Sequence, residues 1–265
     1  MASVRTMEVI DSLLAQGRIA VSTEEAAQLL GVPSDHVRIR MQPLIHGGKV
    51  FSPARGLWVA IPPQYRTWRV IPGIQFIDFM MARLDRDYYV GWLSAAELHG
   101  AAHQRPQVLQ IAVDRGLADR DIARVRLRFT ERRHLADLPR MRHSVPTGQI
   151  WISTPEVTAL DLAANTSLGG GVSNVATVFA ELADQGSLDA GLLAQAAEHY
   201  SLATVRRLGF LLERVDGSDL TLGLHEFCEQ RRRFPPDRLA VGSSQEGKID
   251  SRWRLLVNSE VEPDL

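Results

Sequence analysis

The sequence predicts an α+β protein in which a small N-terminal helical domain, closed by a β-hairpin, precedes a mixed α/β domain. Two observations predict this class. Short helical and strand-like patterns alternate over the first 66 residues, and the rest of the chain has short apolar runs followed by three apolar-striped segments. A chain of 265 residues with 45% hydrophobic content is long enough for two such domains.

The chain is expected to begin with a helix, a short strand and a second helix. Apolar residues recur at helical spacing over residues 4–14, Gly17 is expected to end that helix, and the apolar run 19–21 is typical of a strand. Ser22 and Glu25 form a capping box, whose two side chains satisfy backbone amides at the start of the second helix.

A third helix is expected directly after the short turn "GVPS", with Ser34 as its cap. Its inward positions are Val37, Met41 and Leu44 or Ile45. The polar positions that remain are the candidate DNA-binding residues of this helix: Ser34, His36, Arg38, Arg40 and Gln42.

Two apolar runs, "KVFS" and "LWVAI", flank the turn "PARG" and predict a hairpin with Arg55 at its tip. Helix, strand, helix, short turn, helix and hairpin is the order of a winged helix-turn-helix, whose third helix enters the major groove of DNA. Lys49 and Arg55 therefore join the candidate DNA-binding residues. Pro43 departs from the pattern, because proline removes a helical hydrogen bond at a cost of roughly 3 kcal/mol. The third helix is expected to kink there or to end near Met41.

Charge is distributed unevenly along a chain whose net charge is only −1. Residues 34–66 carry five basic side chains against Asp35, whereas residues 1–33 carry two basic and four acidic ones. This excess favours a phosphate contact over a merely solvated helix face, although a winged helix used only for protein contacts remains an alternative. The arginine clusters 132–133 and 231–233 are interpreted as solvated faces, with a second DNA contact as the alternative.

A Pro-rich segment, "IPPQYRTWRVIPG", predicts a linker, so the expected domains are residues 1–66 and 67–265. The second domain is expected to contain a helix at "FIDFMMARL", a helix that begins at Ser94, and a helix capped by Thr154 with Pro155 in its first turn. Strands are predicted at "YYVG", "QVLQIAV", "VRLRF" and "QIWIS", three packed helices over residues 174–215, and an edge strand at "RWRLLVN".

Three stretches of this second domain, "YYVGWLSAAELHGAAHQRPQVLQIAV", "QIWISTPEVTALDLA" and "IDSRWRLLVN", resemble the AbiEi-type antitoxins of bacterial type IV toxin–antitoxin systems. Two motifs carry this resemblance. The most specific is the helix with "LHG" at 98–100, followed by Gln104 and Pro106. The second is "TPE" at 154–156, which continues to "LDL" at 160–162.

The resemblance implies an antitoxin that neutralises a cognate nucleotidyltransferase-like toxin, directly or indirectly, and represses its own promoter. In this family a winged helix binds inverted repeats in double-stranded DNA, which two monomers or one dimer could occupy. The alternative function is a winged-helix transcriptional regulator whose C-terminal domain senses a ligand or partner unrelated to a toxin.

Residue patterns with catalytic potential are sparse. His99 and His103 have metal-ligand spacing, and Glu246 to Asp250 is similar to a fragment of a metal-dependent nuclease site, but neither pattern has further ligands. We therefore expect no catalytic residue, no metal and no cofactor, and a DNA-processing enzyme is the least supported hypothesis.

Cysteine content and hydropathy bear on the compartment. The only cysteine, Cys228, excludes an internal disulfide and is expected to be a small buried apolar residue. The sequence lacks an apolar run of about 18 residues and a signal-peptide pattern, so we expect a cytoplasmic protein without membrane contact.

Overall fold

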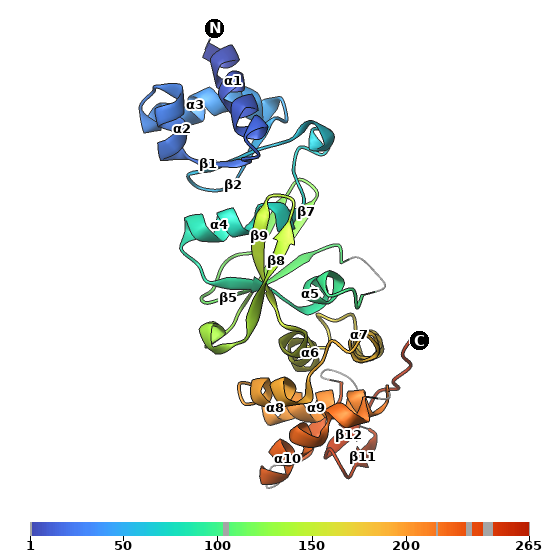
Figure 1. Ribbon diagram of the computed structural model, residues 1–265. Coiled ribbons are helices and arrows are strands. Elements are labelled where there is room, and N and C mark those ends of the chain that lie inside the picture. Colours follow the sequence, from blue (N-terminus) through green and yellow to red (C-terminus); the bar gives the residue numbers. More distant parts are fainter. Residues whose placement is uncertain (1, 103–105, 216, 232–234, 241–245, 265) are drawn as a thin grey trace. The chain divides into compact units, whose positions relative to one another are not determined.

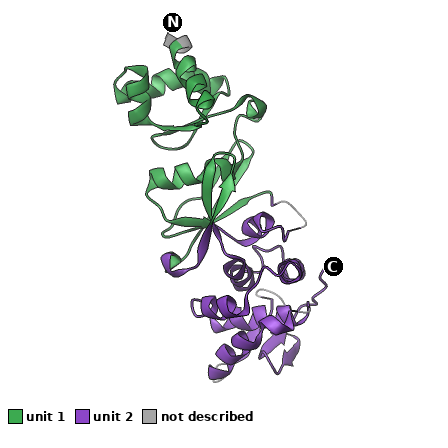
Figure 2. Cartoon of the chain, in the orientation of Figure 1, with its two compact units in different colours: residues 1–89, 107–135, 142–151 green, residues 90–106, 136–141, 152–265 purple. Residues whose placement is uncertain are grey.

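The computed structural model describes residues 2–102, 106–215, 217–231, 235–240 and 246–264, and confirms the α+β class (Figure 1). These residues contain ten α-helices and three sheets. They divide into two compact units (Figure 2). The first unit is residues 1–89, 107–135 and 142–151, and the second is 90–106, 136–141 and 152–265.

The N-terminal segment has the expected order of helix, strand, helix, helix and hairpin. Its elements are α1 (Ala2–Ala15), β1 (Ala20–Ser22), α2 (Thr23–Leu30), α3 (Ser34–His46), β2 (Val50–Ala54) and β3 (Leu57–Ala60). The strands form a sheet of order β1-β3-β2, antiparallel throughout. The cap at Ser22 is confirmed, since its side chain accepts from the Glu25 amide at 3.1 Å. The Glu25 carboxylate pairs with Arg18 instead of completing the capping box.

Helix α3 differs from expectation at both ends. Ser34 is its first residue and not its cap; the cap position is Pro33, which makes no side-chain hydrogen bond to the helix. The expected end near Met41 is also wrong, because the helix continues through Pro43 to His46. A continuous helix over Pro43 leaves the Ile39 carbonyl without the usual donor four residues later. Packing of the buried face therefore outweighs the local cost of proline.

One apolar core holds the N-terminal elements together. The inward residues predicted for α3, namely Val37, Met41 and Leu44, are all buried, and Ile45 packs against the same core. The further buried members are Ile10, Leu13, Val21, Ala26, Ala27, Leu30, Val50, Trp58 and Ala60. Because this core anchors one side of α3, the opposite side is left to solvent.

The first unit also contains most of a six-stranded sheet of order β6-β7-β5-β4-β9-β8. Its strands are β4 (Tyr88–Val90), β5 (Leu109–Val113), β6 (Arg120–Ile122), β7 (Val125–Glu131), β8 (Arg140–Val145) and β9 (Gly148–Ser153). Strand β7 runs parallel to β5 and antiparallel to β6. Helix α4 (Ile77–Leu84) lies before β4, so the helix predicted at "FIDFMMARL" is confirmed.

The second unit is mainly helical. It contains α5 (Trp92–Leu98), α6 (Pro155–Ala164), α7 (Val172–Asp184), α8 (Ala190–Ala197), α9 (Leu202–Glu213) and α10 (Leu222–Gln230). The Thr154 cap of α6 is confirmed, whereas α5 begins two residues before the predicted Ser94. A three-stranded sheet of β10 (Asp237–Arg238), β11 (Lys248–Asp250) and β12 (Leu255–Val257) follows. Strand β12 is the centre of this sheet and not the expected edge.

Candidate nucleic-acid interface

The side of α3 that lies opposite its buried face is exposed, and we call it the crest. Since successive residues are about 100° apart around a helix, the positions opposite Val37, Met41 and Leu44 are those of Ile39, Gln42 and their helical neighbours. These neighbours are Asp35, Pro43 and His46, and all five crest residues are exposed. Ile39 is 69% exposed, which is unusual for so large an apolar side chain.

The two arginines of α3 lie on the flanks of this crest and not on it. They are two residues and therefore about 200° apart around the helix. Arg38 is exposed and Arg40 is half-buried. Neither guanidinium has a hydrogen bond or ion pair to any residue that the structure describes. Both are therefore available to an external anion, one on each side of the helix.

Sequence reasoning missed Ile39 because it searched the helix for polar residues. The signal was present in the spacing: Ile39 lies two residues from Val37 and from Met41, so it cannot share their buried face. In the major groove an exposed apolar side chain can contact the thymine methyl group, and a glutamine can pair with adenine through two hydrogen bonds. The crest thus offers one apolar and one polar base contact, at Ile39 and Gln42.

The remaining candidates lie at the two ends of α3 and on the hairpin. Ser34 and His36 are exposed in its first turns, and Lys49 is half-buried directly after the Gly47–Gly48 turn. The side chain of Arg55 is exposed at the hairpin tip. The structure thus brings Ser34, His36, Arg38 and Gln42 onto exposed positions of one helix.

The hairpin is held by the segment that follows it. The Arg83 Nε of α4 donates to the Arg55 carbonyl at 3.3 Å, and the same guanidinium pairs with Glu24 at 3.5 Å. Gly56 has a left-handed backbone with φ of 80°, and its carbonyl accepts from the Thr23 amide. A side chain at Gly56 would displace the end of the flexible Arg83 side chain, and the left-handed backbone itself favours glycine at this position.

Two further contacts fasten the β2 strand of this hairpin. The rings of Phe51 and Phe76 meet edge to face at 5.2 Å. The Arg120 guanidinium of β6 donates to the Pro53 carbonyl. The hairpin backbone is consequently held against Phe76 and β6, while the Arg55 side chain at its tip stays exposed.

The two motifs that carry the AbiEi resemblance contribute polar side chains to the interior of the second unit. His99 at the end of α5 contacts the Ser153 carbonyl at 2.9 Å through Nε2, and the Ser153 and Thr158 hydroxyls lie 2.7 Å apart. Asp161 of α6 accepts from the Tyr200 hydroxyl at 2.8 Å and is fully buried. The contacts of His99, Ser153 and Thr158 join α5, β9 and α6, so these side chains serve packing in the structure.

Buried arginines form a second group. Arg206 of α9 is 1% exposed and donates to Asp237 at 2.7 Å and to the Pro235 carbonyl at 2.8 Å. Arg207 donates to the carbonyls of Arg238 and Ala163, and desolvation lowers its pKa. Neither side chain is available to a partner.

The other sequence candidates can be placed as follows. Cys228 is buried as expected, and desolvation raises the pKa of its thiol to about 11. Arg231 pairs with Glu198, while the rest of that arginine cluster lies outside the described residues. His103, the partner proposed for His99, also lies outside them. The described part of the chain holds no group of three histidine, cysteine or carboxylate side chains that could bind a metal.

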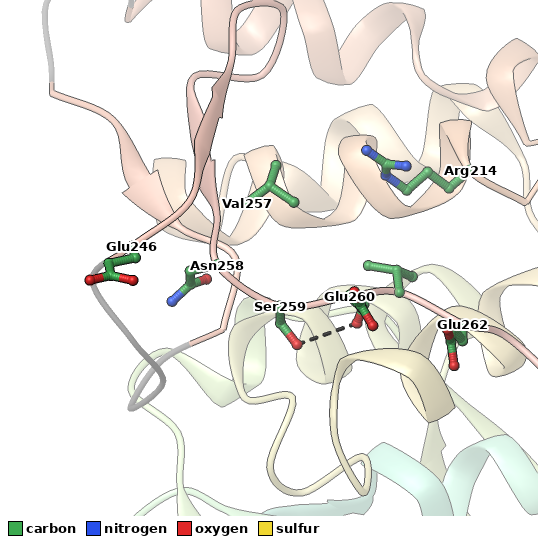
Figure 3. A pocket seen from close by; sticks show the side chains of 8 residues that line it. Arg214, Glu246, Val257, Asn258, Ser259, Glu260 and Glu262 are labelled. Atoms are coloured by element: carbon green, nitrogen blue, oxygen red, sulfur yellow. Dashed lines mark hydrogen bonds between the residues drawn. The ribbon is translucent and has the colours of Figure 1, made fainter.

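A cavity of about 520 Å³ lies beside β12 in the second unit (Figure 3). The ionisable side chains along it are three carboxylates, Glu246, Glu260 and Glu262, and one guanidinium, Arg214. A lining with this excess of negative charge disfavours phosphate. The cavity is therefore a poor candidate for a nucleic-acid or nucleotide site.

Comparison with protein families identifies the middle of the chain. Residues 89–214 match the family model of the AbiEi antitoxin C-terminal domain. This segment is therefore similar to the AbiEi antitoxin C-terminal domain over just under half of the chain. The match includes both sequence motifs described above. The AbiEi domain supports an antitoxin role in a toxin–antitoxin system, and the family is one of antitoxins and not of enzymes.

The fold is shared with a solved structure. The chain is similar to the structure whose title is "Crystal structure of RV2827C protein from Mycobacterium tuberculosis", with a TM-score of 0.68 over 96% of this chain and 90% of that one. The sequence identity is 16%, so this likeness shows the fold alone. Comparison with curated proteins gives no match. Among the described helices, none is long and apolar enough to cross a membrane.

Proposed function

We propose that this protein is the antitoxin and autorepressor of a type IV toxin–antitoxin pair. The AbiEi domain at residues 89–214 supports the antitoxin part. The exposed crest of α3, which has free arginines on both flanks, supports the DNA-binding part. The expected site of action is the cytoplasm, and the expected partners are a nucleotidyltransferase-like toxin and the promoter of the pair.

In this proposal residues 1–66 form a winged helix-turn-helix, and α3 is its reading helix. Ile39 and Gln42 contact base edges in the major groove, because they project furthest from the buried face. Arg38 and Arg40 reach the phosphate strands on the two sides of that groove. Base contacts specify the sequence, while phosphate contacts fix register and supply salt-dependent affinity.

The DNA-binding part is tested with a promoter reporter in cells. The full chain should repress a reporter driven by the region upstream of its own gene, and Gln42→Ala should relieve this repression by roughly tenfold, as expected when one base contact worth about 1–3 kcal/mol is lost. His143→Gln, at a half-buried position of β8 and away from α3, serves as the control. Full repression by Gln42→Ala would show that the crest of α3 does not contact the operator.

The antitoxin part is tested separately by co-expression. The full chain should restore growth of cells that express the nucleotidyltransferase-like gene encoded beside it. The Gln42→Ala variant should rescue equally well, because the AbiEi domain is unchanged in it. If neither protein rescues growth while repression persists, the chain is a transcriptional regulator of another system.

A further inference from the structure

We propose that a second DNA-backbone contact lies beside the end of α3, built from the turn at residues 65–69 and the tip of the β6–β7 hairpin. Both segments belong to the first unit (Figure 2). This inference rests on the proposed DNA binding by α3 and extends its footprint along the duplex. The occupant is the phosphate backbone that flanks the site contacted by α3.

The turn presents an aromatic side chain and an arginine to solvent. Trp68 is 45% exposed, and its ring lies 5.8 Å from that of Tyr65. The Tyr65 carbonyl accepts from the amides of Trp68 and Arg69, at 2.9 and 3.1 Å, so the turn has a defined shape. Arg69 is exposed and adopts a left-handed backbone with φ of 58°. This conformation is uncommon for a residue that is not glycine.

The β6–β7 hairpin supplies the second cation. Its two-residue turn, Ala123 and Arg124, joins the paired residues Ile122 and Val125. The Arg124 guanidinium lies over the Trp68 ring at 5.9 Å from its centroid. This distance is at the outer limit of a cation–π contact, which attracts the guanidinium to the exposed ring and leaves its N–H groups free for an acceptor. Arg124 has no ion pair with any described residue.

The turn adjoins the residues that end α3, and the hairpin tip adjoins the turn through Trp68. A Cβ on Gly48, in the turn that ends α3, would lie 3.1 Å from the Arg69 Cγ. The Arg69 side chain therefore packs against the end of the reading helix, and Lys49 follows in the same turn. In helix-turn-helix proteins of the homeodomain type, the C-terminal end of the reading helix contacts the DNA backbone. The position of Arg69 and Arg124 is consistent with such a contact.

Charge distinguishes these arginines from others on the same sheet. Arg128 pairs with Asp119 and Asp121, and Arg126 stands opposite Asp121 in the β6–β7 ladder. Their charge is therefore largely balanced. Arg69 and Arg124 have no carboxylate partner among the described residues, so they present uncompensated positive charge next to an exposed ring, a combination suited to phosphates and sugars.

The test measures how the binding constant of the full chain for its own upstream DNA depends on salt. The double variant Arg69→Gln/Arg124→Gln should reduce the slope of log K against log salt by about two units, since each phosphate contact releases about one counterion. At 150 mM salt this corresponds to roughly a thirtyfold loss of affinity, equal on specific and scrambled DNA. Trp68→Ala should reproduce part of the loss, while Trp68→Phe should retain the ring and the affinity.

The matched control is Arg133→Gln, an exposed arginine beyond the opposite end of β7. It should leave slope and affinity unchanged. If the parent protein binds its DNA and the double variant has the parental slope, this second contact is wrong while the function of α3 stands. If the parent has no preference for its upstream DNA, the proposed repressor function itself fails.

Discussion

Two helices of this protein carry a pair of arginines in similar sequence surroundings, but one pair is accessible to solvent and the other is buried. In "VRIR" of α3 the arginines flank an exposed crest and have no partner among the described residues. In "VRRL" of α9 both are buried, and Arg206 is bonded to Asp237. The comparison teaches that arginine type and spacing do not identify a ligand-binding face. Burial and existing partners decide whether the charge is available.

The largest expected effect is on stability, and it comes from removing a buried arginine of α9. Arg206→Ala should lower the free energy of unfolding by about 2–4 kcal/mol, because Asp237 and the Pro235 carbonyl lose their donor and a cavity remains. Urea unfolding measures this loss. Arg214→Ala, at the exposed end of the same helix, should cost less than about 1 kcal/mol. Equal losses for both variants would refute the structural role of Arg206.

The matching change on α3 should affect binding and not stability. Arg38→Ala/Arg40→Ala should weaken binding to specific and scrambled DNA alike, by about 2 kcal/mol for two lost phosphate contacts at 150 mM salt. Fluorescence anisotropy measures the affinity, and urea unfolding should show a change within about 0.5 kcal/mol. A stability loss as large as that of Arg206→Ala would mean that the α3 pair is structural as well.

A third prediction concerns the effect of Pro43 on the stability of α3. Pro43→Ala should raise the free energy of unfolding by about 1–2 kcal/mol, because a helical hydrogen bond to the Ile39 carbonyl becomes available while the unfolded chain gains some freedom. The measurement is the urea midpoint, with Gln42→Ala as the control at a neighbouring exposed position of α3. A lower midpoint for Pro43→Ala would show that the proline ring contributes packing that outweighs the bond.

The smallest expected effect is at the hairpin. Arg55→Ala should flatten the salt dependence of DNA binding by about one unit, which corresponds to roughly a fivefold loss at 150 mM salt. The hairpin backbone is held by Arg83, so the variant removes only the exposed side chain. An unchanged slope would show that Arg55 does not contact a phosphate and that the hairpin has a structural role alone.

Local patterns predicted most of the fold. Helical periodicity located the described helices except α10, the caps at Ser22 and Thr154 are present, and the turn at Arg55 and Gly56 joins the expected strands. The errors concern features that depend on tertiary packing and on strand pairing. Packing carries α3 through Pro43, and β12 becomes a central strand because β10 and β11, which the sequence patterns did not predict, both pair with it.

The candidate site was predicted less completely than the fold. Sequence reasoning named α3 and its polar residues as the candidate site, but Ile39 was missed because exposure of an apolar residue depends on the whole buried face. The fastening of the hairpin by Arg83 and Arg120 involves residues 28 and 67 positions away along the chain. Such contacts have no signature in a local pattern, and neither does the burial of Arg206.

The most direct test of the account is an anisotropy titration of the full chain with the duplex upstream of its own gene, against a scrambled duplex, at about 150 mM salt. We predict a preference of at least a thousandfold for the upstream duplex, as for specific DNA-binding proteins, and a loss of roughly tenfold on that duplex alone for Gln42→Ala. Equal affinity of the parent protein for both duplexes would contradict the claim that the crest of α3 reads DNA.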